Sequence, residues 1–107
     1  MSPGLMLGLA IVTEVIGTAL LRVSDGFTKV GPSIGVVIGY VASVILLAKV
    51  LRDLDIGLTY AIWAGAGTAM IAIIGVVAWN EPMGALKVAS LAAVIVGVAG
   101  LNLSAAH

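Results

Sequence analysis

One acidic residue interrupts an apolar segment near the start of the chain, and its side chain is the one best placed to do chemistry. Glu14 lies in the middle of LAIVTEVIGTALLR, residues 9–22. A charged side chain at the centre of a membrane span costs about 3 kcal/mol on insertion scales and usually faces a bundle interior or a cavity. No Lys or Arg lies inside an apolar segment to pair with it. Glu14 is therefore predicted as a site where a proton and a cationic ligand compete.

Small residues accompany Glu14 on the same helical stripe. Ala10, Gly17 and Thr18 lie three or four residues from it, which places them on one face of a helix. These small side chains are expected to leave space beside the carboxylate. A permanently neutral Glu14 that donates one hydrogen bond is the alternative interpretation.

Aromatic and hydroxyl side chains at similar depth are candidates for the walls of such a space. Trp63, in LTYAIWAGAGTAM, is predicted to stack against a cation, with ordinary packing as the alternative. Tyr60 shares its face and is either a second wall or an interfacial residue. Tyr40 and Ser43 lie one turn apart on another segment, where each donates a hydrogen bond into a cavity or links helices.

Glycines in the third apolar segment have two possible roles. Gly65 and Gly67 lie two and four residues after Trp63. Either they let the helix bend, or they let a partner helix approach closely.

Composition assigns the chain to the membrane. Of its 107 residues 62% are hydrophobic, the mean hydropathy is +1.26, and only ten side chains are charged, five of each sign. Ten charges cannot give a soluble domain of this size its polar surface. The chain is therefore predicted to be an integral membrane protein, with the lipid bilayer as its surroundings.

Several function classes are excluded on the same grounds. The chain has no cysteine, so it has neither disulfides nor a thiolate nucleophile. Its net charge of +0 and lack of a basic stripe argue against a nucleic-acid partner. No metal-ligand spacing, cofactor motif or nucleophile–base pair is present, so no metal, no cofactor and no enzymatic activity are expected.

Four apolar segments are long enough to span a bilayer, and short polar breaks separate them. Each must be an α-helix, because lipid-exposed backbone has to satisfy its own hydrogen bonds. The prediction is one all-α transmembrane domain over residues 1–107, with four antiparallel helices joined by short connections. The predicted helices are 4–21, 32–51, 57–79 and 85–103.

Basic residues give little indication of orientation. Lys49 and Arg52 lie on the side of the N-terminus, and Arg22, Lys29 and Lys87 lie on the other. The N-terminal amino group nearly levels that difference. One fixed orientation and insertion in both orientations remain open.

The last apolar segment carries no ionisable group in its interior but has small residues at regular spacing. Ala89, Ala93 and Gly97 recur every four residues, and Gly100 follows. Such rows mark close helix–helix contacts, here predicted to join two copies of the chain. Two copies supply eight helices and two Glu14 carboxylates, enough to enclose a chamber.

These residues resemble the small multidrug resistance family over essentially the whole chain. The matching pieces are EVIGTALLR with Glu14, DGFTKVGPS at 25–33, YAIWAGAG at 60–67 and GLNL near the C-terminus. The resemblance implies proton-coupled export of lipophilic or quaternary ammonium cations across the bacterial inner membrane, driven by the proton gradient.

The resemblance also implies site residues and an assembly. Glu14 corresponds to the family's proton- and cation-binding glutamate, Trp63 to its tryptophan, and Tyr40 and Tyr60 to its tyrosines. Ser43 matches a polar position that supports the glutamate. The family forms dimers, commonly of two oppositely oriented copies paired through the fourth helix, and some members pair with a non-identical subunit.

Two alternatives to multidrug export remain at this point. Guanidinium exporters of the family carry a tryptophan where this chain has Gly17, whereas Gly17 and Thr18 match the quaternary ammonium branch. Gly4 and Ala64 depart from that branch, which often has an aromatic residue and a serine there. A non-transporting membrane partner, in which Glu14 is an assembly contact, is the other alternative.

Overall fold

The structure is a computed structural model that describes residues 1–105 and consists of four long helices. Each helix is long and apolar enough to cross a membrane. Their bounds are α1 Pro3–Val23, α2 Val30–Val50, α3 Ile56–Trp79 and α4 Ala85–Ala105. The predicted ranges miss these ends by at most two residues. Among the described residues there is no strand.

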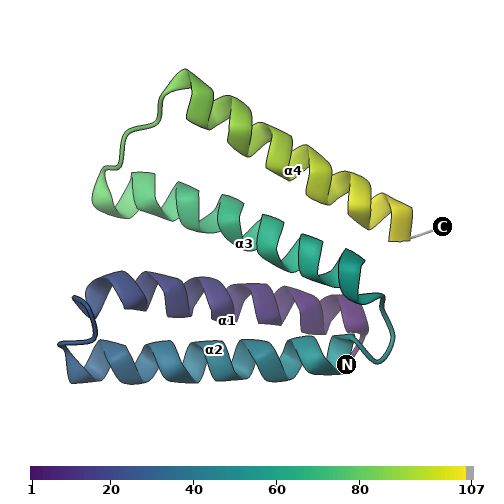
Figure 1. Cartoon of the computed structure of the whole chain (residues 1–107), viewed down its shortest axis with the longest axis horizontal. Coiled ribbons are helices and arrows are strands. Elements are labelled where there is room, and N and C mark those ends of the chain that lie inside the picture. The colour runs from purple at the N-terminus through teal and green to yellow at the C-terminus, as the bar shows by residue number, and fades with distance from the viewer. Residues whose placement is uncertain (106–107) are drawn as a thin grey trace.

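The helices alternate in direction and lie in a row rather than in a closed bundle (Figure 1). The order across the row is α2, α1, α3, α4, so α1 is flanked by α2 and α3, whereas α4 packs mainly on α3. The molecule measures 44 × 35 × 18 Å, which is too thin for four helices packed around one axis. The short connections correctly predicted that neighbouring helices alternate in direction. They do not bring α4 round to α2, so the four helices do not form a closed bundle.

Local chemistry explains where the helices begin and end. Ser2 caps α1, since its hydroxyl accepts a hydrogen bond from the Leu5 amide at 3.2 Å. The turn after α1 holds three consecutive residues with positive φ, Asp25, Gly26 and Phe27. Asn80 ends α3 in the left-handed conformation, which asparagine tolerates better than most residues.

The α1–α2 pair is in close backbone contact. A Cβ atom added to Gly39 would lie 2.9 Å from the Thr13 carbonyl oxygen and 3.1 Å from the Gly17 Cα. Only a glycine at position 39 allows this approach, because backbone atoms cannot move aside as a side chain does. The two helices therefore form one stiff unit.

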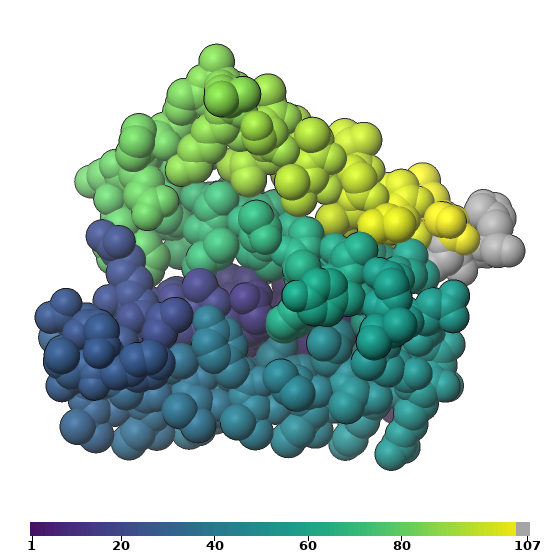
Figure 2. Space-filling view, in the orientation of Figure 1, coloured from purple at the N-terminus to yellow at the C-terminus, as the bar shows by residue number. Residues whose placement is uncertain are grey.

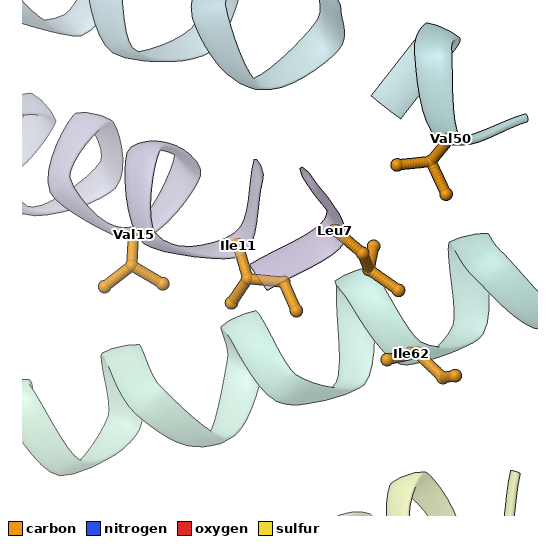
Figure 3. Packing of buried hydrophobic residues seen from close by; sticks show 5 residues of the cluster. All are labelled: Leu7, Ile11, Val15, Val50 and Ile62. Carbon is orange, nitrogen blue, oxygen red and sulfur yellow. The ribbon is translucent and has the colours of Figure 1, made fainter. Parts of the chain in front are cut away.

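The α1–α3 seam is instead held by side chains. Leu7, Ile11 and Val15 of α1 pack with Val50, the last residue of α2, and Ile62 of α3 (Figure 3). This cluster is the main buried core of the described chain. It fills the seam mostly on the side of the N-terminus and the α2–α3 connection.

α4 is the least buried helix. None of its described residues is buried, and its side chains form one edge of the molecule (Figure 2). It contacts α3 where Gly65 faces Val98, since a Cβ at position 65 would lie 2.6 Å from that valine's side chain. A single chain thus leaves most of α4 to lipid or to another protein.

Candidate functional site

Glu14 lies where α1 faces both α2 and α3, and one of its carboxylate oxygens is hydrogen-bonded. Thr18, one turn further along α1, donates its hydroxyl hydrogen to Glu14 Oε1 at 3.1 Å. The Tyr40 hydroxyl of α2 lies 2.6 Å from the Thr18 oxygen. While Glu14 is ionised it can only accept, so the single Thr18 hydrogen goes to Glu14 and Tyr40 donates to Thr18. The result is a directed chain from Tyr40 through Thr18 to the carboxylate.

The second carboxylate oxygen has no partner. Glu14 Oε2 is buried without a hydrogen bond. It lies against α3 at Gly67, where an added Cβ would come within 2.6 Å of it. Gly67 is therefore a close-packing position that makes room for the carboxylate. A buried, unpaired carboxylate oxygen is costly, so it is the atom at which an incoming positive charge gains most.

Ser43 links all three helices around the site. Its hydroxyl donates to the Ala10 carbonyl at 2.6 Å and accepts from Trp63 Nε1–H at 3.1 Å. Ser43 makes no hydrogen bond to Glu14 in this structure, where Thr18 does, so its support of the glutamate stays a prediction. Ser43 instead fixes the orientation of the Trp63 indole beside the carboxylate.

A cavity of about 440 Å³ opens beside these groups. Glu14, Tyr40, Ser43 and Trp63, all predicted from the sequence, line it. Val44 completes the lining and was missed, although it lies four residues after Tyr40 and hence on the same face of α2. The cavity combines a carboxylate, two aromatic rings and an apolar wall, a combination suited to an organic cation.

Other predicted site residues lie behind or beside this lining. Ala10 is fully buried and takes part through its carbonyl. Gly17 is also buried, and the Tyr40 ring occupies the space next to it, 3.1 Å from where a Cβ would stand. The prediction that Gly17 leaves open space beside Glu14 is therefore wrong. Tyr60 is 58% exposed and contacts the Trp63 ring, with centroids 5.5 Å apart.

The small residues of α4 are not part of this cavity. Ala89, Ala93, Gly97 and Gly100 are all exposed in the single chain. Gly65, unlike Gly67, faces α4 through Val98. Both glycines thus occupy close-packing positions in this structure, which was one of their two predicted roles.

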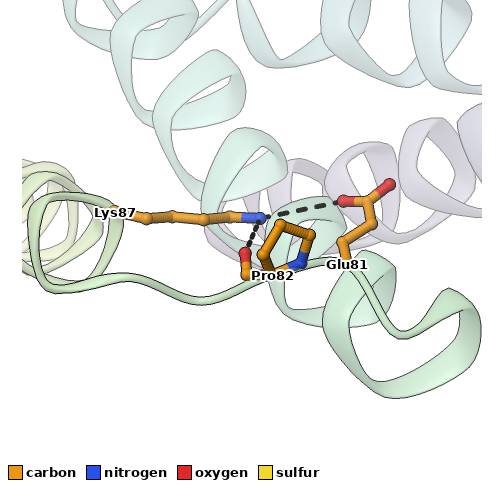
Figure 4. Close-up of polar contacts among 3 residues, drawn as sticks. All are labelled: Glu81, Pro82 and Lys87. Atoms are coloured by element: carbon orange, nitrogen blue, oxygen red, sulfur yellow. Dashed lines mark hydrogen bonds and ion pairs between the residues drawn. The ribbon is translucent and has the colours of Figure 1, made fainter.

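Two cation contacts at one end of the molecule were not predicted. The Arg22 guanidinium carbon lies 5.1 Å from the centre of the Trp79 ring. Lys87 lies 3.8 Å from Glu81 Oε1 and donates to the Pro82 carbonyl at 3.1 Å (Figure 4). The Arg22–Trp79 contact was hidden by sequence separation, since the two residues are far apart in the chain and lie at the ends of helices. Glu81 and Lys87, in contrast, are close in the sequence, on either side of the start of α4.

The fold and the site together define a class of protein. Four membrane-spanning helices hold an intramembrane carboxylate in a cavity with aromatic walls, and such a residue typically marks a substrate or ion pathway. A family model described as Small Multidrug Resistance protein matches residues 4–101. The chain belongs to this family and is a multi-pass protein of the bacterial inner membrane.

Curated relatives cover nearly the whole chain. The multidrug resistance protein EbrB of Bacillus subtilis is 42% identical over 103 residues, 96% of this chain and 88% of that protein. The nicotine metabolites export pump subunit NepA of Paenarthrobacter nicotinovorans is 45% identical over 94% of this chain and 86% of its own. The quaternary ammonium compound-resistance protein QacC of Staphylococcus aureus is 37% identical over 94% of both.

Replacing Ser43 by Ala is expected to loosen the junction of the three helices. The substitution leaves the Trp63 indole N–H without its acceptor, so the free energy of unfolding should fall by about 1–3 kcal/mol. In a Trp79→Phe background, which leaves Trp63 as the one tryptophan, its fluorescence emission should shift. Thermal unfolding in detergent and emission spectra provide the measurements.

Ser33→Ala is the matched control on the same helix. The Ser33 hydroxyl bonds only to the carbonyl of Lys29, within its own turn. This variant should leave both stability and emission close to wild type. An unchanged Trp63 emission in Ser43→Ala would contradict the hydrogen bond.

Proposed function

We propose that the chain exports organic cations in exchange for protons, and that both bind at Glu14. The observation that carries the proposal is Glu14 itself, a carboxylate that lines a cavity walled by Trp63 and Tyr40 and whose Oε2 has no hydrogen-bond donor. A proton on the carboxyl group or a cation beside it offsets the cost of the unpaired oxygen. Only one of them is needed at a time, so the two ligands exclude each other.

This competition couples the two flows. A ligand shifts a conformational equilibrium only through its different affinity for the two states. The cation adds contacts with the aromatic walls that a proton does not make, so each ligand stabilises its own arrangement of the helices. Protons that bind from one side of the membrane then displace the cation toward that same side, and a cation that binds from the other side displaces the protons there.

Glu14→Gln is expected to abolish this coupling. The amide keeps the shape of the side chain but neither ionises nor attracts a cation as a carboxylate does. Uptake of tetraphenylphosphonium into proteoliposomes with an imposed pH gradient should fall to the level of protein-free liposomes. The release of protons when the same cation is added to purified protein in detergent should vanish as well.

Glu81→Gln is the matched control, because Glu81 is the other glutamate of the chain and lies outside the cavity. It should retain uptake and proton release. Full uptake by Glu14→Gln would overturn the mechanism. Absence of proton release in the wild type would favour the alternative of a non-transporting membrane partner, in which Glu14 is an assembly contact.

The substrate class we propose is lipophilic and quaternary ammonium cations rather than guanidinium. The names of the relatives support this, since one is a quaternary ammonium compound-resistance protein and another exports nicotine metabolites. The structure changes the role of Gly17 in this argument. Gly17 provides no open space but seats the Tyr40 ring, which then forms a flat wall next to the carboxylate.

A direct comparison of substrates tests the choice. At equal pH gradients, the initial rate of uptake should be higher for a bulky aromatic quaternary ammonium compound than for guanidinium. The reason is that a small guanidinium ion buries little apolar surface against Trp63, Tyr40 and Val44. The reverse order of rates would assign the chain to guanidinium export.

The working unit in this proposal is a dimer, with two chains in opposite orientations as the commonest arrangement of the family. The open row of helices supports it, because α4 packs on α3 along one side and one chain leaves the rest of α4 exposed. A pair of identical chains is the simplest form. One relative is named as a pump subunit, so a pair of non-identical chains is the alternative form of the dimer.

Replacing Gly97 by Leu should weaken the dimer. The residue is exposed and has open space around it in the single chain, so the new side chain disturbs only a contact made with another molecule. Val96→Leu, on the neighbouring exposed face, is the control. Cross-linking in liposomes should show fewer dimers for Gly97→Leu alone, and equal yields for both variants would contradict pairing through this face.

A further inference from the structure

The contact between Arg22 and Trp79 joins two helices at one membrane face. Arg22 is the next-to-last residue of α1, and Trp79 is the last residue of α3. The guanidinium carbon lies 5.1 Å from the ring centre, within the range of a cation–π interaction. Both residues belong to the end of the molecule that carries the α1–α2 and α3–α4 connections (Figure 1).

This contact lies on the seam that also holds Glu14. Arg22 follows Glu14 by eight residues, which is about 12 Å along the helix axis. On α3, Trp79 lies beyond Gly67 in the same direction, and Gly67 is where Glu14 Oε2 meets that helix. The Arg22–Trp79 contact therefore stands between the carboxylate and one face of the membrane.

The α1–α3 seam lacks the close backbone contact of the α1–α2 seam. The α1–α2 seam is closed by backbone contact at Gly39 and by the Tyr40 ring on Gly17. Only side chains hold α1 to α3. On the N-terminal side of Glu14 the α1–α3 seam is filled by the apolar cluster around Leu7 and Ile62. Apolar packing continues past Glu14 through Ile71 and Ile74, and the Arg22–Trp79 pair is the outermost contact at that end.

We propose that Arg22 and Trp79 form a releasable clamp that holds the Glu14 site closed toward this face. The clamp rests on the proposed function, in that it gives the exchange of access a physical latch. It suits that task, because a single exposed cation–π contact is strong enough to bias two states and weak enough to break in each cycle. Its loss should shift the closed-to-open ratio at this end by about two- to fivefold.

The distance between the two helix ends tests the clamp without substrate or transport. The chain has no cysteine, so Val23→Cys and Val77→Cys introduce unique labelling sites next to the clamp, both at exposed positions. Nitroxides at these sites report their separation by double electron–electron resonance. An excess of cysteine-free chains ensures that most labelled chains pair with an unlabelled one.

The expected result is a larger population of long distances in Arg22→Gln and in Trp79→Leu, by about two- to fivefold over the parent. The double variant should show no further increase, since both changes break one contact. Trp79→Phe keeps an aromatic ring, so its distance distribution should be closer to that of the parent. This graded result would not be expected if the Trp79→Leu effect came from misfolding.

Lys29→Gln is the matched control. It also removes one positive charge at this end, but Lys29 makes no ion pair and no ring contact among the described residues. Its distance distribution should match the parent. Parent-like distributions in Arg22→Gln and Trp79→Leu, or an equal change in Lys29→Gln, would overturn the clamp.

A second measurement connects the clamp to transport. Joining the two cysteines with a bis-maleimide should stop uptake of tetraphenylphosphonium, while proton release on adding it in detergent persists through the other side. Full uptake after complete cross-linking would also overturn the clamp. If Glu14→Gln leaves uptake intact, the proposed function fails, but the distance measurements still decide whether the clamp exists.

Discussion

The structure depends on one constraint, the presence of a carboxylate in a membrane interior without a basic partner. Thr18 satisfies Glu14 Oε1, and nothing satisfies Oε2. In water the unpaired oxygen would be hydrated at no cost, but in a low-dielectric site its lost hydration has to be offset by a hydrogen bond or a positive charge. The helices around it are arranged so that the compensation comes from outside the chain, which is what a site for exchangeable ligands requires.

The neighbouring residues keep that oxygen free rather than bind it. Ser43 and Trp63 are close and polar, yet their hydrogens are used on the Ala10 carbonyl and on Ser43 itself. Tyr40 is directed to Thr18. Each donor has a partner of its own, so none swings over to Glu14 without breaking a hydrogen bond. The network therefore leaves Oε2 without a donor and fixes the aromatic walls of the cavity.

The sequence was enough to predict the helices, their alternation and most of the cavity. Long apolar runs between turn residues leave little choice of fold in a membrane. Glu14 was identifiable because it is costly, and Trp63 because it is rare and lies at similar depth. The partners of Ser43 and Thr18 were not predictable, since they depend on how far each helix is rotated about its axis. That rotation follows from packing between helices.

Gly17 was correctly predicted to lie near the site, but the reason given for its small size was wrong. A small residue beside a carboxylate was expected to leave room for a substrate. Its neighbour on α2 was not part of that reasoning, and the Tyr40 ring takes the space. The glycine still affects the site, because a larger residue there would push the ring toward the cavity.

The two ends of the α1–α3 seam differ in their outermost contact, which is aliphatic packing at one end and a cation–π pair at the other. On the N-terminal side the seam is closed by buried aliphatic side chains, whose separation exposes apolar surface to whatever enters. Toward the other end the apolar packing continues through Ile71 and Ile74 of α3, and the outermost contact is Arg22 on Trp79, whose partners are both readily accommodated at a membrane interface when they separate. With the proposed clamp, the outermost contact at the end of the connections after α1 and α3 is therefore the one that separates at the lower cost within one chain. In a dimer of oppositely oriented copies, each membrane face would receive one end of each kind, so the two faces would be equivalent although the single chain is not.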